Sequence, residues 1–226
     1  MTTILFDLDG TLVETAPDLL AATNAVLDGE GLSHVRRADL NHLVGHGGRA
    51  MLGKALAMHG READDATLDR LVPVFLDAYR ASIPGDSAPF PGVREALDRM
   101  VRAGHTLAVC TNKFEGLSRA LLAALDLSSQ FAIIAGPDTF GVRKPDPAHI
   151  LRTIEGVGGR SDDAVMIGDS YNDVEAARRA GIPSIGVPFG YTDTPIRELG
   201  PDAVIEGYDQ LDADLVARVV ARRGSS

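Results

Sequence analysis

Four aspartates occupy positions where carboxylate chemistry is expected, in two pairs far apart in the chain. Residues 3–6 form a short, mostly apolar run typical of a β-strand before the first pair, and residues 164–167 form another before the second. Carboxylates gathered in one crevice repel one another by roughly 4 kcal/mol per close pair at an effective dielectric constant near 20. A divalent cation offsets this repulsion, and oxygen ligands without a Cys/His cluster favour Mg²⁺ over zinc. The candidate metal ligands are Asp7, Asp9, Asp169 and Asp173.

Three further residues suit a phosphate ligand. Thr111 and Asn112 follow a third apolar run at residues 106–110, and Lys144 lies in a loop before a helix. A hydroxyl, an ammonium and a metal around an exposed carboxylate favour phosphoryl transfer, in which an aspartate oxygen attacks phosphorus and forms an aspartyl-phosphate. A second carboxylate two residues further on can protonate the leaving oxygen and later activate water. These residues predict an enzyme acting on a phosphate ester.

The elements that must position these groups alternate between strands and helices from residue 89 onward. This alternation with short connections predicts an α/β fold, a doubly wound, Rossmann-like parallel sheet with helices on both faces. Right-handed crossovers then place the carboxyl ends of all strands, and the residues that follow them, at one edge of the sheet. The expected strands are residues 3–6, 106–110, 131–134, 164–167, 184–187 and 203–205.

A helical segment interrupts the alternation after the first strand. Residues 15–83 carry three apolar stripes at helical spacing, separated in part by a glycine-rich turn at 45–48. Pro73 lies inside the third stripe and predicts a kink or a late start of that helix. We expect an all-helical cap domain at 15–83, inserted into a core domain formed by residues 1–14 and 84–226.

Four motifs resemble those of the haloacid dehalogenase-like phosphatases. They are FDLDGT at residues 6–11, Thr111 at the end of a strand, Lys144, and GDSYND at residues 168–173. Their order and spacing match that family over nearly the whole chain, with a helical cap between the first motif and the second. The combination is highly specific, whereas Asp-x-Asp alone is a weak signal.

The resemblance implies a role for each motif residue. Asp7 is expected to be the nucleophile and an Mg²⁺ ligand, and Asp9 the general acid and base, with its backbone carbonyl on the metal. Asp169 completes the metal site, and Asp173 ligates the metal or orients its ligands. Thr111 and Lys144 are expected to hold the phosphoryl oxygens, whereas Asn112 either shapes the turn or contacts the substrate.

Within that family, further cues resemble the bacterial phosphoglycolate phosphatases. They are CTNK (110–113), KPDP (144–147), PFGY (188–191) and the cap turn VGHGGRAML (44–52). The expected substrate is therefore a small phosphorylated metabolite, 2-phosphoglycolate first. A phosphatase of another phosphorylated sugar such as N-acetylmuramate 6-phosphate, a phosphosugar mutase, and a non-catalytic ligand-binding protein remain alternatives. Asp9 argues against the dehalogenase and phosphonate-hydrolase branches, in which this second aspartate is replaced.

The glycine-rich turn of the cap is the candidate for binding the other end of the substrate. Arg49 can bind a carboxylate through two hydrogen bonds, and the backbone N–H groups of Gly47 and Gly48 can do the same. A plain helix start is the alternative interpretation of this turn.

Composition sets the remaining expectations. The chain has 226 residues, 45% of them hydrophobic, and a formal net charge of −10, which argues against nucleic acid as a partner. It has no apolar stretch long enough to span a bilayer and no signal peptide at its start, so no membrane partner is expected. One cysteine, Cys110, fits a reducing compartment. We expect a cytoplasmic monomer or homodimer.

Overall fold

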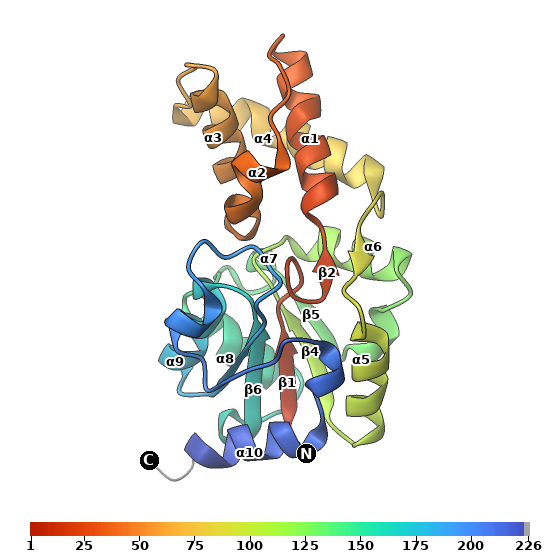
Figure 1. Cartoon of the computed structure of the whole chain (residues 1–226). Coiled ribbons are helices and arrows are strands. Elements are labelled where there is room, and N and C mark those ends of the chain that lie inside the picture. The colour runs from red at the N-terminus through yellow and green to blue at the C-terminus, as the bar shows by residue number, and fades with distance from the viewer. Residues whose placement is uncertain (224–226) are drawn as a thin grey trace.

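The computed structural model describes residues 1–223, except for the side chains of residues 41, 42 and 223. It consists of a core of strands and helices and of a group of helices that stands over one edge of the central sheet (Figure 1). The core sheet is parallel, with strand order β5-β4-β1-β6-β7-β8. The expected α/β fold is therefore confirmed. The strands are β1 (Thr3–Phe6), β4 (Thr106–Cys110), β5 (Ile133–Ala135), β6 (Ala164–Gly168), β7 (Ser184–Gly186) and β8 (Ala203–Val204).

Helices cover both faces of the sheet. Ile4 and Phe6 of β1 pack into one hydrophobic cluster with α5 and α10, whereas Leu5 between them packs into another with α8 and α9. Successive strand residues point to opposite faces, so a strand that is apolar throughout must be covered on both. The core helices are α5 (Val93–Arg102), α6 (Glu115–Ala124), α7 (Pro137–Phe140), α8 (Pro147–Gly156), α9 (Tyr171–Ala180) and α10 (Ala213–Arg223).

Residues 16–82 form the helical group that we call the cap, with a hydrophobic cluster of its own. Its last helix starts at Asp65, where the Asp64 side chain accepts a hydrogen bond of 2.8 Å from Thr67 N, and it continues through Pro73. The alternative of a late helix start at Pro73 was therefore wrong, because the Asp64 side chain caps the N-terminus of the helix and the helix already begins at Asp65. The cap elements are α1 (Ala16–Gly29), α2 (Arg37–Leu40), η1 (Asn41–His46), α3 (Gly48–Met58) and α4 (Asp65–Ser82).

The two connections between core and cap form a short antiparallel ribbon. Its strands are β2 (Val13–Glu14) and β3 (Ala88–Pro89), which the sequence pattern does not predict because two residues carry no periodicity. One core strand also differs from expectation: β5 begins at Ile133 rather than at Phe131. The preceding residues form the 3₁₀ helix η2 (Ser128–Gln130), and Phe131 is its C-cap.

Candidate active site

The parallel sheet brings the sequence motifs to one edge, directly below the cap. Asp7 follows β1, Thr111 follows β4 and Asp169 follows β6, while Asp173 lies in the first turn of α9. The backbone N–H of Asp7 donates to Ile167 O (2.9 Å), so the sheet hydrogen bonds continue up to the first aspartate. The backbone of Asp7 is therefore held by the central strands of the sheet, which fixes the point from which its side chain starts.

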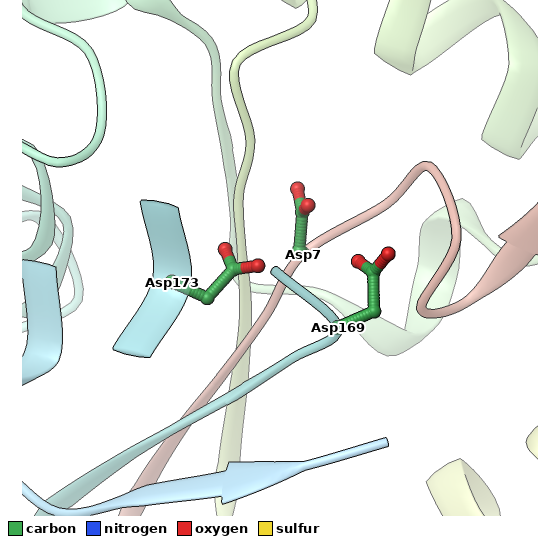
Figure 2. A group of neighbouring side chains, drawn as sticks. All are labelled: Asp7, Asp169 and Asp173. Atoms are coloured by element: carbon green, nitrogen blue, oxygen red, sulfur yellow. The ribbon is translucent and has the colours of Figure 1, made fainter. Parts of the chain in front are cut away.

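Three of the four aspartates lie together. One carboxylate oxygen each from Asp7, Asp169 and Asp173 fall within 4.8 Å of one another, and all three residues are buried (Figure 2). Asp7 Oδ1 is buried, and among the described residues the Lys144 ammonium is its one charged partner. A buried donor set made of three carboxylates fits a hard divalent cation such as Mg²⁺. These three residues could hold the expected metal.

The cluster is short of positive charge. Burial, together with the charges of Asp173 and Asp9 and against the attraction of Lys144, raises the pKa of Asp7 to about 6. Burial and the neighbouring carboxylates of Asp173 and Asp7 likewise raise the pKa of Asp169 well above its usual value. A raised pKa means that the surroundings, taken together, disfavour the charged form of the carboxylate. The electrostatics of the cluster therefore favour a bound cation.

Lys144 supplies the one ammonium group paired with this cluster among the described residues. Its side chain is buried, with Nζ 2.6 Å from Asp173 Oδ1 and 3.0 Å from Asp7 Oδ1. Burial opposes its charge, but the attraction of Asp173 and Asp7 prevails and raises the pKa of Lys144. Lys144 therefore stays charged beside the first aspartate.

Asn112 holds the backbone of Lys144 in place. The Asn112 Nδ2 donates to Lys144 O (3.0 Å), and Lys144 N donates to Asn112 Oδ1 (2.9 Å). The side-chain amide of Asn112 thus makes one hydrogen bond as donor and one as acceptor with the backbone of Lys144, which lies in another loop. The structure places Asn112 as the anchor of the lysine, with its side chain also at the wall of the cavity described below.

Asp173 and Asp169 are oriented by hydrogen bonds from their own loops. Ser170 donates to Asp173 Oδ2 from its backbone (3.0 Å) and from its hydroxyl (2.7 Å), which forms a capping box at the start of α9. Thr11 Oγ1 donates to Asp169 Oδ1 (3.0 Å), and Tyr191 N donates to Asp169 Oδ2 (2.7 Å). The FDLDGT and PFGY segments contain Thr11 and Tyr191, but their types alone do not reveal these contacts.

Gly190 leaves room for the carboxylate of Asp169, because a Cβ atom at position 190 would overlap that carboxylate. We expect Gly190→Ala to displace Asp169, one of the three candidate metal ligands, and to lower kcat/KM for phosphate-ester hydrolysis by about 10- to 100-fold, as is usual when the surroundings of a metal ligand are disturbed. Gly29→Ala is the matched control, because a Cβ atom there meets nothing within 4 Å. Steady-state kinetics at several Mg²⁺ concentrations measure the effect. Equal kcat/KM in the two variants would contradict it.

Asp9 stands apart from the three clustered carboxylates and pairs with Lys113. The Lys113 Nζ lies 3.0 Å from both carboxylate oxygens of Asp9 and 4.3 Å from the ring centroid of Tyr79, which belongs to α4 of the cap. Sequence reasoning gave Lys113 no role. Its position two residues after Thr111, in a chain with only three lysines, was the available signal.

A cavity of about 90 Å³ separates the core residues from the cap. The core contributes Asp7, Asp9, Thr111, Asn112 and Lys113, and the cap contributes Gly45, Gly47, Gly48 and five larger apolar or aromatic side chains. The glycine at position 48 is required because a Cβ atom there would overlap the ring of Phe75. The core-side aspartates and the glycine-rich turn of the cap thus face one another across the same space.

Arg49 lies away from this cavity. Its guanidinium is half-exposed and pairs with Asp65 Oδ1 (2.7 Å) and Asp69 Oδ1 (2.5 Å). These two carboxylates belong to α4, so Arg49 ties α3 to α4 within the cap. This placement does not support the expected contact between Arg49 and the substrate, and it leaves Gly47 and Gly48 as the candidates from the turn.

The chain is similar to known proteins in sequence and in fold. The family model described as haloacid dehalogenase-like hydrolase matches residues 4–187. Phosphoglycolate phosphatases from Mesorhizobium japonicum and Agrobacterium fabrum are each 50% identical to the chain, over 98% and 96% of its length and 97% and 94% of theirs. The crystal structure of a predicted phosphoglycolate phosphatase from Haemophilus somnus superposes with a TM-score of 0.87 at 27% identity, covering 96% of this chain and 97% of that one. The chain belongs to the haloacid dehalogenase-like hydrolases.

Proposed function

We propose that the protein is a Mg²⁺-dependent phosphatase that hydrolyses 2-phosphoglycolate to glycolate and phosphate through an aspartyl-phosphate on Asp7. The observation that carries this proposal is the buried cluster of Asp7, Asp169, Asp173 and Lys144 beside a small cavity under the cap. The phosphoglycolate phosphatases that are 50% identical over nearly the whole chain support the choice of substrate.

In the first step, an oxygen of Asp7 attacks phosphorus, the ester P–O bond breaks, and the leaving oxygen takes a proton from Asp9. Thr111 Oγ1 accepts a hydrogen bond of 3.2 Å from Lys113 N, so the hydroxyl proton of Thr111 is available for a phosphoryl oxygen. Lys144 lies beside the attacking carboxylate, where it offsets the repulsion between Asp7 and the incoming anion.

In the second step, Asp9 takes a proton from water, the water oxygen attacks phosphorus, and the bond between Asp7 and phosphorus breaks. The cap walls the cavity on the side away from the sheet, so that bulk water is excluded during the first step. The side chains of Asp7, Asp169 and Asp173 and the backbone carbonyl of Asp9 would hold Mg²⁺. When bound, the cation neutralises charge on the transferred phosphoryl group.

Phosphate release from 2-phosphoglycolate, with Mg²⁺ and after treatment with a chelator, tests the proposal. A panel of phosphorylated sugars and acids, N-acetylmuramate 6-phosphate included, compares kcat/KM across the substrate alternatives. Incubation with a hexose 1-phosphate distinguishes a phosphatase from a phosphosugar mutase, because a mutase would give an isomerised sugar phosphate without free phosphate. The absence of turnover on the whole panel would contradict the proposed activity.

Binding of Mg²⁺ should also stabilise the fold, because the cation pairs with carboxylates that repel one another. At a concentration 100 times its dissociation constant, Mg²⁺ is expected to add about 2.7 kcal/mol to the free energy of unfolding. Thermal unfolding with and without Mg²⁺ measures this, and Asp169→Asn should lose most of the gain. A melting temperature that does not respond to Mg²⁺ in the wild-type protein would argue against the metal site.

We further propose that the enzyme acts in the cytoplasm, as a monomer or homodimer, on a small phosphorylated metabolite. The single cysteine, Cys110, is buried, and the acidic composition disfavours nucleic acid as a partner. Over the described residues, the structure contains no helix with the length and apolar composition needed to cross a membrane.

A further inference from the structure

The cavity has an unusual distribution of charge. Among the described residues that line it, Lys113 is the one cationic side chain, beside the carboxylates of Asp7 and Asp9. Most of the remaining wall is apolar, with Phe75 and Leu117 as examples from the cap and the core. A substrate that carries a second anionic group beyond its phosphate therefore has Lys113 as its cationic partner in this wall.

The Lys113 ammonium is held firmly in place. Its side chain is only 6% exposed, it lies 3.0 Å from both oxygens of Asp9, and it sits over the ring of Tyr79. An ammonium group has three N–H donors, and the two Asp9 oxygens take at most two of them. A substrate carboxylate can accept a charged hydrogen bond from the third N–H. This bond would form in a water-poor site, where such bonds are strong.

The position of Lys113 relative to Asp9 selects a short substrate. In the proposed mechanism Asp9 protonates the ester oxygen, and in 2-phosphoglycolate the carboxylate carbon lies two bonds beyond that oxygen. An ammonium group 3.0 Å from the Asp9 oxygens is therefore within reach of a carboxylate attached to the ester carbon. A substrate with a neutral hydroxyl in place of the carboxylate would be attracted much less strongly by the Lys113 ammonium.

Tyr79 offers a second donor at the same place. The residue is 1% exposed and lines the cavity, and no group among the described residues accepts the proton of its hydroxyl. Burial raises the pKa of Tyr79, which keeps the proton on its hydroxyl. A buried hydroxyl proton without an acceptor is costly, and a bound carboxylate would supply that acceptor.

We propose that Lys113 and the hydroxyl of Tyr79 form a subsite for the substrate carboxylate, one donor from the core and one from the cap. The ligand class is a phosphomonoester whose ester carbon bears a carboxylate. The inference rests on the proposed phosphatase function and moves the expected carboxylate contact from Arg49 to these two side chains. Because the subsite is complete only with Tyr79 of α4 in place, it also couples substrate recognition to the cap.

The test compares two substrates that differ only at this end, 2-phosphoglycolate and the neutral 2-hydroxyethyl phosphate. We expect Lys113→Met to reduce the ratio of their kcat/KM values roughly 10- to 100-fold, the cost of a lost charged hydrogen bond. Tyr79→Phe should reduce the same ratio roughly 3- to 10-fold. Lys54→Met removes the same charge from an exposed position on α3 and should leave the ratio unchanged.

The ratio separates the subsite from other effects of the same substitutions. Loss of the ion pair with Asp9 lowers turnover of both substrates in Lys113→Met and cancels in the ratio. If the wild type hydrolyses 2-phosphoglycolate and Lys113→Met keeps the wild-type ratio, the subsite is wrong while the phosphatase stands. An unchanged ratio in Tyr79→Phe overturns the part assigned to the hydroxyl. If the wild type hydrolyses neither substrate, the proposed function itself fails.

Discussion

Replacing Asp7 by Asn is expected to lower kcat on 2-phosphoglycolate by about 10⁴-fold or more, which is typical for loss of a covalent nucleophile. An amide oxygen is a poor nucleophile, so the aspartyl-phosphate cannot form at position 7. The shape of the side chain is retained, and the substitution removes a buried carboxylate whose pKa is raised to about 6. We therefore expect the metal-free variant to be folded and no less stable than the wild type.

Phosphate release measures the expected loss of kcat in Asp7→Asn, and thermal unfolding measures its expected stability. Asp77→Asn is the matched control, because Asp77 is an exposed carboxylate on α4 that pairs with Arg80. Mass spectrometry of wild-type enzyme quenched in acid during turnover should find phosphate on the peptide that contains Asp7. Wild-type activity in Asp7→Asn would exclude the covalent mechanism, and an unfolded variant would show that the carboxylate is needed for the fold.

The core and the motifs at its edge are predictable from the sequence because topology leaves them little choice. Residues 4–6 and 164–167 are apolar throughout, which is typical of strands covered on both faces. In a parallel sheet their carboxyl ends must share an edge, and because β1 and β6 are neighbours in the sheet, Asp7 and Asp169 lie close together. Short apolar runs are local signals of the strands, and the right-handed crossover rule then places the carboxyl ends of the strands. Together they are sufficient to predict this part of the fold.

The cap side of the cavity is less predictable because it depends on the direction of individual side chains. The sequence indicates a helix start near Arg49, but it does not show that Asp65 and Asp69 on the next helix take up the guanidinium. Nor does it show that Tyr79 covers Lys113, a contact between residues in the cap and in the core. Such contacts follow from the way whole helices pack against one another. Apolar periodicity indicates only which face of a helix is buried.

The Lys144 ammonium group should matter for stability as well as for catalysis. It is buried between Asp7 and Asp173, and Lys144→Met would leave both carboxylates without their ammonium partner. Removing one partner of a buried ion pair costs about 3–5 kcal/mol, and one lost electrostatic contact to the reacting group costs about 10²- to 10³-fold in rate. We expect losses of this size in the free energy of unfolding of the metal-free protein and in kcat.

Mg²⁺ should offset the stability loss in Lys144→Met but not the loss of rate. With the ammonium group gone, the carboxylates of Asp7 and Asp173 attract the cation more strongly, so Mg²⁺ should stabilise the variant more than the wild type. The reacting phosphate still lacks the lysine, so turnover stays low. Denaturant unfolding with and without Mg²⁺ measures the difference, with Lys54→Met as the exposed control. An equal Mg²⁺ effect in both proteins would mean that the lysine and the metal act on the carboxylates independently.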